Sequence, residues 1–161
     1  IVKLAQEKGY TEPDPRDDLK GTDFMRKMLI LARDAGHPLE AEDVKVENIL
    51  PQSCLDARSV DDFYAALKDS EAYFTELKNK AESGGKVLRY VGKLEDGQAT
   101  ITLQMVDEHH PFYMLSGSDN IISFTTERYK ERPLVVKGPG AGAEVTAAGV
   151  FSDLVNVGAL K

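Results

Sequence analysis

The chain has few of the residues that build disulfide frameworks and zinc sites: one cysteine and three histidines in 161 residues. The single cysteine, Cys54, cannot form an internal disulfide, and no Cys/His set stands at zinc-site spacing. The composition therefore argues against a disulfide scaffold, a dithiol redox site and a zinc module.

Long apolar runs and an excess of basic charge are also missing. No segment approaches the roughly 20 apolar residues of a membrane-spanning helix, and no secretory signal pattern opens the chain. Acidic residues outnumber basic ones by 27 to 20, a formal charge of -7, so the surface should repel nucleic acid and anionic membranes. We expect a soluble cytoplasmic protein with neither nucleic-acid nor membrane partners.

The hydrophobic fraction of 42% is enough for one buried core, so we expect one globular unit. Apolar periodicity and turn residues predict a helix over 22–35 capped by Thr22 or Asp23, and a closing helix over about 143–157. Between them, Ser59 followed by Asp62 predicts a capped helix that carries Phe63, Ala66 and Leu67, and Ser70 is the predicted cap of a further helix that ends at Gly84-Gly85. Strands are predicted over 44–50, 120–126 and 134–137, and over 87–94 and 99–106 as a hairpin turning at Asp96-Gly97. Helices early and antiparallel strands late predict an α+β fold, with helices on one face of a mostly antiparallel sheet.

An acidic, proline-rich segment occupies residues 10–21, where two prolines and a glycine argue against regular structure. It contains Glu12, Asp14, Asp17 and Asp18, with Arg16 between them. Such charge density is unfavourable unless the carboxylates lie in water or a positive group binds them. The segment is therefore either a solvated loop leading into the next helix or a site for a cationic small molecule. It fits a calcium loop poorly, since the EF-hand pattern is missing.

Asp23 and Lys27 stand four residues apart on the helix that follows, and so share one face. They form either an ordinary surface ion pair or, in a partly desolvated cleft, a pair able to exchange a proton with a substrate oxygen. Two further motifs carry weaker signals. Gly138-Pro139-Gly140-Ala141-Gly142 is a poor phosphate loop, and histidines placed like His109 and His110 are more often solvated than catalytic.

The stretch Gly9-Tyr10-Thr11-Glu12-Pro13-Asp14-Pro15-Arg16-Asp17-Asp18-Leu19, followed by Gly21, Asp23, Arg26 and Lys27, resembles the signature of homoserine dehydrogenases. The resemblance extends through residues 86–92, 117–120 and 140–150, while residues 37–85 match only loosely. It implies NAD(P)-dependent interconversion of L-homoserine and L-aspartate 4-semialdehyde, on the route to threonine and methionine.

The resemblance also implies roles for particular residues. Tyr10, Glu12 and Asp18 would contact homoserine, and Asp23 with Lys27 would be the acid/base pair at the reacting oxygen. Gly142 and Thr146 would touch the cofactor; no metal ligand is implied.

The family's N-terminal Rossmann domain, which would bind most of the NAD(P), is not among these 161 residues. We therefore expect residues 1–137 to be a substrate-binding and dimerisation domain, and residues 138–161 a C-terminal helix that returns to the nucleotide-binding domain. The parent would be a homoserine dehydrogenase or a bifunctional aspartokinase fusion, forming a homodimer through the hairpin region, and the chain alone would be inactive. Two alternatives stay open: a non-catalytic small-molecule-binding or dimerisation module, and a divalent-metal site made of the carboxylates.

Overall fold

The computed structural model describes residues 1–9, 11–117, 119–140 and 142–159. It divides the chain into two compact units, Ile1–Val106 and Asp107–Lys161, so the expectation of one globular unit is wrong. The reason is the distribution of apolar contacts: among the described residues, every buried hydrophobic side chain belongs to the first unit. The functional division into 1–137 and 138–161 stays a prediction.

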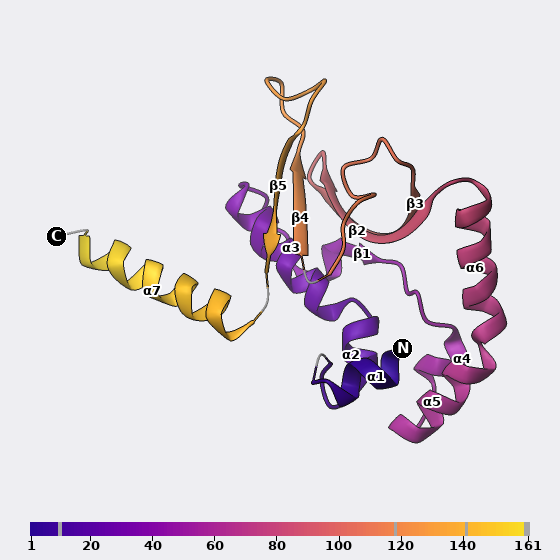
Figure 1. Ribbon diagram of the computed structural model, residues 1–161. Coiled ribbons are helices and arrows are strands. Elements are labelled where there is room, and N and C mark those ends of the chain that lie inside the picture. The colour runs from indigo at the N-terminus through magenta and orange to yellow at the C-terminus, as the bar shows by residue number, and fades with distance from the viewer. Residues whose placement is uncertain (10, 118, 141, 160–161) are drawn as a thin grey trace. The chain divides into compact units, whose positions relative to one another are not determined.

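The first unit begins with helices and ends with a hairpin (Figure 1). Its elements are α1 (Val2–Glu7), α2 (Pro15–Leu19), α3 (Thr22–Asp34), the 3-10 helix η1 (Ala41–Asp43), β1 (Val44–Val46), α4 (Gln52–Leu55), α5 (Val60–Asp69), α6 (Glu71–Ser83), β2 (Val87–Glu95) and β3 (Gln98–Val106).

The sheet of the first unit has the strand order β1-β3-β2. Strands β2 and β3 pair antiparallel from Val87 opposite Val106 to Glu95 opposite Gln98. Asp96 and Gly97 make the turn with φ of 50° and 75°, the left-handed pair that a two-residue hairpin requires, so the predicted hairpin is confirmed. Strand β1 joins β3 in parallel. The α+β class is confirmed, and the parallel edge strand is an addition to the expected antiparallel pattern.

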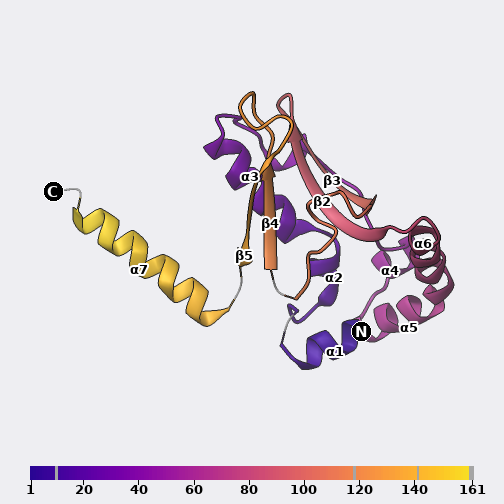
Figure 2. The same cartoon turned by 45° about the horizontal axis from the view of Figure 1, so that its top comes forward.

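Helix α3 covers one face of this sheet (Figures 1 and 2). Its buried residues Met28 and Leu29 form a core with Val44, Ala99 and Ile101 of the strands. Burial of this apolar face fixes the rotation of α3 about its axis. The helical period then places the residues of the opposite face in solvent.

A second apolar cluster holds the short helices together. Leu50, Cys54 and Phe63 are buried at its centre, with Val2, Leu19 and Tyr64 among the side chains packed around them. The prediction of a helix capped by Ser59 is confirmed, since the Ser59 hydroxyl accepts a hydrogen bond from the Asp62 amide at 3.1 Å. This cluster places α1 and α2 against α4 and α5.

Two local predictions at the start of the chain were wrong. Residues 10–21 were expected to lack regular structure, but Pro15–Leu19 form α2. Asp14 caps this helix, and Pro15 stands at its start, where a missing N–H leaves no hydrogen bond unmade. The cap of α3 is Gly21, with φ of 76°, rather than Thr22 or Asp23, because the two-residue link from α2 to α3 passes through left-handed backbone.

Two boundaries further along also differ from expectation. Strand pairing of β1 ends at Val46 rather than at residue 50, and the chain then turns so that Leu50 enters the second cluster. Ser70 precedes α6 as predicted, but its hydroxyl donates to the Ala66 carbonyl at 2.8 Å instead of capping the helix.

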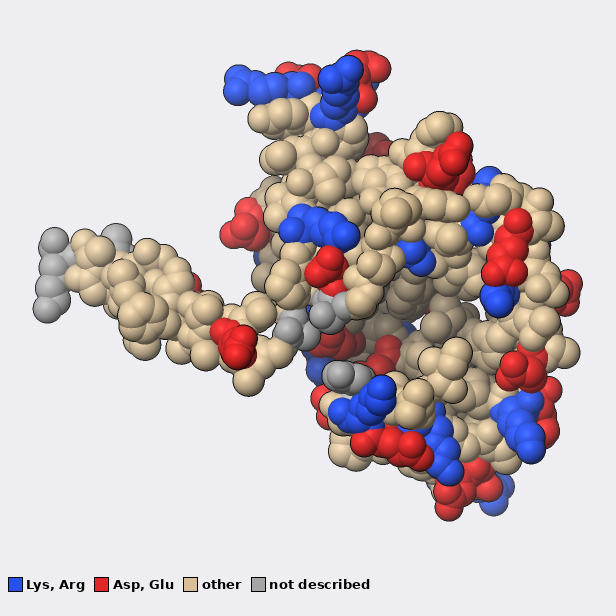
Figure 3. Space-filling view, in the orientation of Figure 1, with Lys and Arg blue, Asp and Glu red and all other residues tan. Residues whose placement is uncertain are grey.

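The second unit consists of a two-stranded hairpin and a helix: β4 (Asp119–Phe124), β5 (Leu134–Pro139) and α7 (Ala143–Ala159). The strands pair antiparallel from Asp119 opposite Pro139 to Phe124 opposite Leu134. Helix α7 contains two charged residues, Glu144 and Asp153, and the face of it seen in Figure 3 is mostly uncharged. Within the described parts of the chain, no helix combines the length and apolar character needed to cross a bilayer.

Candidate functional site

The acidic segment owes its shape to an arginine. The Asp14 carboxylate accepts hydrogen bonds from the Arg16 amide at 3.0 Å and from Arg16 Nε at 2.9 Å. Arg16 Nη1 donates to the carbonyl of Ala57, just before α5, and the Arg16 side chain is only 15% exposed. The side-chain hydrogen bond from Arg16 holds the pKa of the Asp14 carboxyl below its usual value. Asp14 and Arg16 therefore serve to fix the start of α2.

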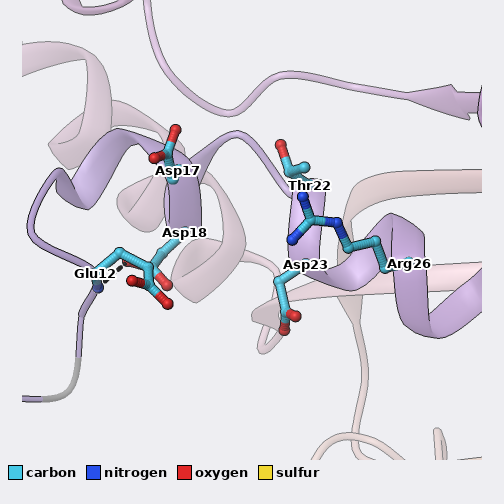
Figure 4. Close-up of a pocket in the computed structure, with 6 residues that line it drawn as sticks. All are labelled: Glu12, Asp17, Asp18, Thr22, Asp23 and Arg26. Atoms are coloured by element: carbon cyan, nitrogen blue, oxygen red, sulfur yellow. Dashed lines mark hydrogen bonds between the residues drawn. The ribbon is translucent and has the colours of Figure 1, made fainter.

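Two more hydrogen bonds fold the preceding residues over α2. The Glu12 amide donates to Asp18 Oδ2 at 2.9 Å, and Gln6 Nε2 of α1 donates to the Pro13 carbonyl at 3.0 Å. The carboxylates of Glu12 and Asp18 are thereby held on the same side of the segment (Figure 4).

A cavity of about 560 Å³ lies between this segment and the first turns of α3. Its lining residues are Glu12, Asp17, Asp18, Thr22, Asp23 and Arg26. Figure 4 shows the side chains of Glu12, Asp17 and Asp18 on one side, and those of Thr22, Asp23 and Arg26 on the other. Four carboxylates against one guanidinium make the lining strongly anionic, and such a lining favours a ligand with a positive charge.

Lys27 lies beside this pocket and forms an ion pair with Asp23, one of its lining residues. Its Nζ is 2.8 Å from Asp23 Oδ2, one turn earlier on α3. Both side chains are 60% exposed, so the partly desolvated cleft considered from the sequence is not present around this pair in the chain itself. The pair has the geometry of an exposed i,i+4 ion pair, and its role as acid and base stays a prediction.

The structure brings together three of the residues selected from the sequence, Glu12, Asp18 and Asp23, as lining of one pocket, with Lys27 adjacent. Tyr10 lies outside the described residues. Gly142 and Thr146 belong to the second unit.

Sequence reasoning gave Thr22 and Arg26 no role at the site, and Asp17 only a place in the acidic segment, although all three line the pocket. Arg26 stands three residues after Asp23 and four after Thr22, so helical spacing placed it on the same side of α3. That spacing was the signal that could have identified it.

The residues expected to touch NAD(P) open α7. Gly142 has φ of 120°, which favours glycine, and an added Cβ would meet no atom within 4 Å. The Thr146 amide donates to the Gly142 carbonyl at 3.0 Å, which begins the helix. The amides of a first helical turn are donors without helical acceptors, so open space beside Gly142 and such donors fit a polar or anionic part of a cofactor.

The divalent-metal alternative finds no support in the geometry. Across residues 1–9, 11–117, 119–140 and 142–159, no group of three or more His, Cys, Asp or Glu side chains is arranged to hold a metal ion.

Fold and pocket together define a broad class, an α+β domain with an anionic pocket. Comparison with known proteins narrows the class. The sequence profile described as homoserine dehydrogenase matches residues 1–155. The chain therefore belongs to the homoserine dehydrogenase family.

Individual relatives agree with this assignment. The chain is 49% identical over 159 residues to the Zea mays protein named bifunctional aspartokinase/homoserine dehydrogenase 2, chloroplastic, with 98% of this chain and 17% of that protein covered. It is 48% identical over 160 residues to the homoserine dehydrogenase of Schizosaccharomyces pombe, covering 98% of this chain and 43% of that protein. The chain thus spans less than half the length of these curated relatives.

Among solved structures, a Candida auris protein of unknown function has a TM-score of 0.91 and 41% identity to the chain. The match covers 99% of this chain and 45% of that one. The fold described above is therefore found within a longer protein.

Proposed function

We propose that the chain is the substrate-binding and catalytic part of a homoserine dehydrogenase, which interconverts L-homoserine and L-aspartate 4-semialdehyde with NAD(P). The observation that carries the proposal is the gathering of Glu12, Asp18 and Asp23 around one pocket. Family membership supplies the reaction class, and the pocket supplies a place for the substrate.

The charge of the pocket suits the amino group that both substrates share. Carboxylates around a cavity accept hydrogen bonds from an ammonium group and balance its charge. Asp18 uses Oδ2 for the Glu12 amide, which leaves Oδ1 and the Glu12 carboxylate for the ligand. A rigid segment that carries these groups also lowers the entropy lost on binding.

Lys27 is positioned to move a proton at the other end of the substrate. Its Nζ is held by Asp23 and would donate a proton to the carbonyl oxygen of the aldehyde during reduction. In the oxidation of homoserine the lysine would pass a proton to the Asp23 carboxylate, 2.8 Å away, and its amine would then accept the proton of the hydroxyl.

The hydride is the part of the reaction that NAD(P) supplies or accepts when it is bound. Of this chain, Gly142 and Thr146 at the start of α7 would hold part of the cofactor, and the rest would be held by the nucleotide-binding domain. For that reason we expect no turnover from the chain alone.

The test is a graft in which the chain replaces the matching 160 residues of the S. pombe homoserine dehydrogenase. We expect the graft to reduce NADP with homoserine, measured by absorbance at 340 nm. Lys27→Met should lower kcat by at least about 100-fold, the usual effect of losing a general acid or base. The melting temperature should not change, since an exposed i,i+4 pair contributes only about 0.3–0.5 kcal/mol.

Lys78→Met is the matched control. Lys78 also forms an i,i+4 pair, with Glu82 at 3.5 Å, its side chain is 68% exposed, and it lies on α6. Turnover by Lys78→Met should stay within about twofold, because surface changes of this kind are nearly neutral. A folded graft without activity, or Lys27→Met with normal kcat, would contradict the proposal and favour the non-catalytic module.

A further inference from the structure

A chain of two hydrogen bonds links the acidic segment to helix α5, far away in sequence. Tyr64 of α5 donates from its hydroxyl to Gln6 Oε1 at 2.7 Å, across 58 residues. Gln6 Nε2 in turn donates to the Pro13 carbonyl at 3.0 Å. Pro13 directly follows Glu12, one of the carboxylates that line the pocket.

The direction of both hydrogen bonds follows from the chemistry of the groups. A proline carbonyl can only accept, so the amide nitrogen of Gln6 must face it. The amide oxygen of Gln6 then faces Tyr64, whose hydroxyl must donate. Gln6 therefore holds the Pro13 carbonyl, next to Glu12, at a fixed position relative to the Tyr64 hydroxyl.

Tyr64 is itself held firmly. Its ring packs on Phe63 with centroids 5.4 Å apart, and both belong to the apolar cluster of Leu50 and Cys54. Burial raises the pKa of the Tyr64 hydroxyl, and the charges of Glu7 and Asp14 raise it further. The hydroxyl therefore keeps its proton, and remains a donor, throughout the neutral pH range.

We propose that Gln6 and Tyr64 are positioning residues of the substrate site, which hold the Glu12 backbone so that its amide meets Asp18 and its carboxylate faces the ligand ammonium. The inference rests on the proposed function for the identity of the ligand. The positioning role itself can be tested without any ligand, because the hydrogen bond from the Glu12 amide to Asp18 Oδ2 reports the position of the segment.

The experiment uses Tyr64→Phe, which removes the hydroxyl and keeps the ring. The readouts are amide hydrogen exchange by NMR and titration of the chain with L-homoserine. Loss of one net hydrogen bond corresponds to roughly a threefold to tenfold change. We expect that factor both in faster exchange of the Glu12 amide and in weaker binding of homoserine.

Tyr73→Phe is the matched control, because Tyr73 lies on α6 with its side chain 43% exposed and packs on Phe74. It should leave both readouts unchanged. The Asp62 amide, which donates to the Ser59 hydroxyl in α5, is the internal reference. A general loss of stability in Tyr64→Phe would speed exchange at Asp62 as well as at Glu12, whereas positioning predicts a change at Glu12 alone.

Gln6→Glu gives an independent arm. A carboxylate still accepts from Tyr64 but cannot donate to Pro13, so this variant should reproduce the effect of Tyr64→Phe at Glu12. Since the two residues act in series, the double variant should exchange no faster than Gln6→Glu alone.

The outcomes separate the two proposals. Unchanged Glu12 exchange in Tyr64→Phe, equal acceleration at Asp62, or additive effects in the double variant would each overturn the positioning role. Failure of the unaltered chain to bind homoserine would overturn the proposed substrate role instead, and Glu12 exchange would still decide the positioning role.

Discussion

Alanine in place of Gly92 tests how closely helix α3, which carries Asp23 and Lys27, packs on the sheet. A Cβ on Gly92 would stand 2.6 Å from Met28 Sδ and 3.1 Å from Phe24 Cζ. Carbon and sulfur atoms in proteins pack at about 3.5–4.0 Å, so the new methyl group and these side chains must separate by roughly 1 Å.

The magnitude follows from two opposing effects. Overpacking of a core typically costs about 1–3 kcal/mol. Replacing glycine lowers the entropy of the unfolded chain and stabilises by about 0.4–1 kcal/mol. The φ of Gly92 is not positive, so backbone strain adds nothing. We expect Gly92→Ala to lower the free energy of unfolding of the first unit by about 1–2 kcal/mol.

The assay is urea unfolding of the chain, followed by NMR signals of the first unit. With a urea dependence of about 2 kcal/mol per molar, the middle of the usual range, the midpoint should fall by about 0.5–1 M. Gly138→Ala is the control, since Gly138 is also in a strand, lacks a positive φ, and has no atom within 4 Å of an added Cβ. The packing argument fails if Gly92→Ala unfolds at the same urea concentration as the unchanged chain.

Two further predictions concern helix starts. Ser59→Ala removes the acceptor for the Asp62 amide and should destabilise the first unit by about 1 kcal/mol, measured by urea unfolding; Ser83→Ala, at an exposed helix end, should not. Asp14→Asn keeps a capping side chain but cannot ionise. Because the folded-state pKa of Asp14 is lowered, its contribution is complete above the ordinary pKa near 3.9 and is lost as pH falls below that value. The stability gap between the unchanged chain and Asp14→Asn should therefore shrink between about pH 5 and pH 2, and a constant gap would contradict this account.

The candidate site was accessible from the sequence only in part. Carboxylates within seven residues, followed by Asp23 and Lys27 on a helix, indicated an anionic site because their spacing alone keeps them near one another. The sequence did not indicate how exposed the side chains of Asp23 and Lys27 would be. That the Asp23–Lys27 pair is 60% exposed depends on which elements cover α3, and nothing in local spacing decides that.

Local sequence determined the elements whose formation depends on neighbouring residues. The hairpin at Asp96-Gly97 and the Ser59-capped helix form from interactions within a few positions, so the sequence predicted them correctly. The same local reasoning failed at Pro15, because proline breaks a helix interior but is favourable at a helix start. The cap that Asp14 makes with the Arg16 amide shows that Pro15 is at a helix start.

Tertiary structure alone decided how the pocket is supported. Tyr64 reaches Gln6 across 58 residues, and Arg16 reaches the Ala57 carbonyl across 41. The parallel pairing of β1 with β3 likewise joins residues 44–46 to 99–101. Such contacts form when the burial of distant apolar surfaces outweighs the entropy of closing long loops, a balance that depends on the whole chain and leaves no periodic trace in the sequence.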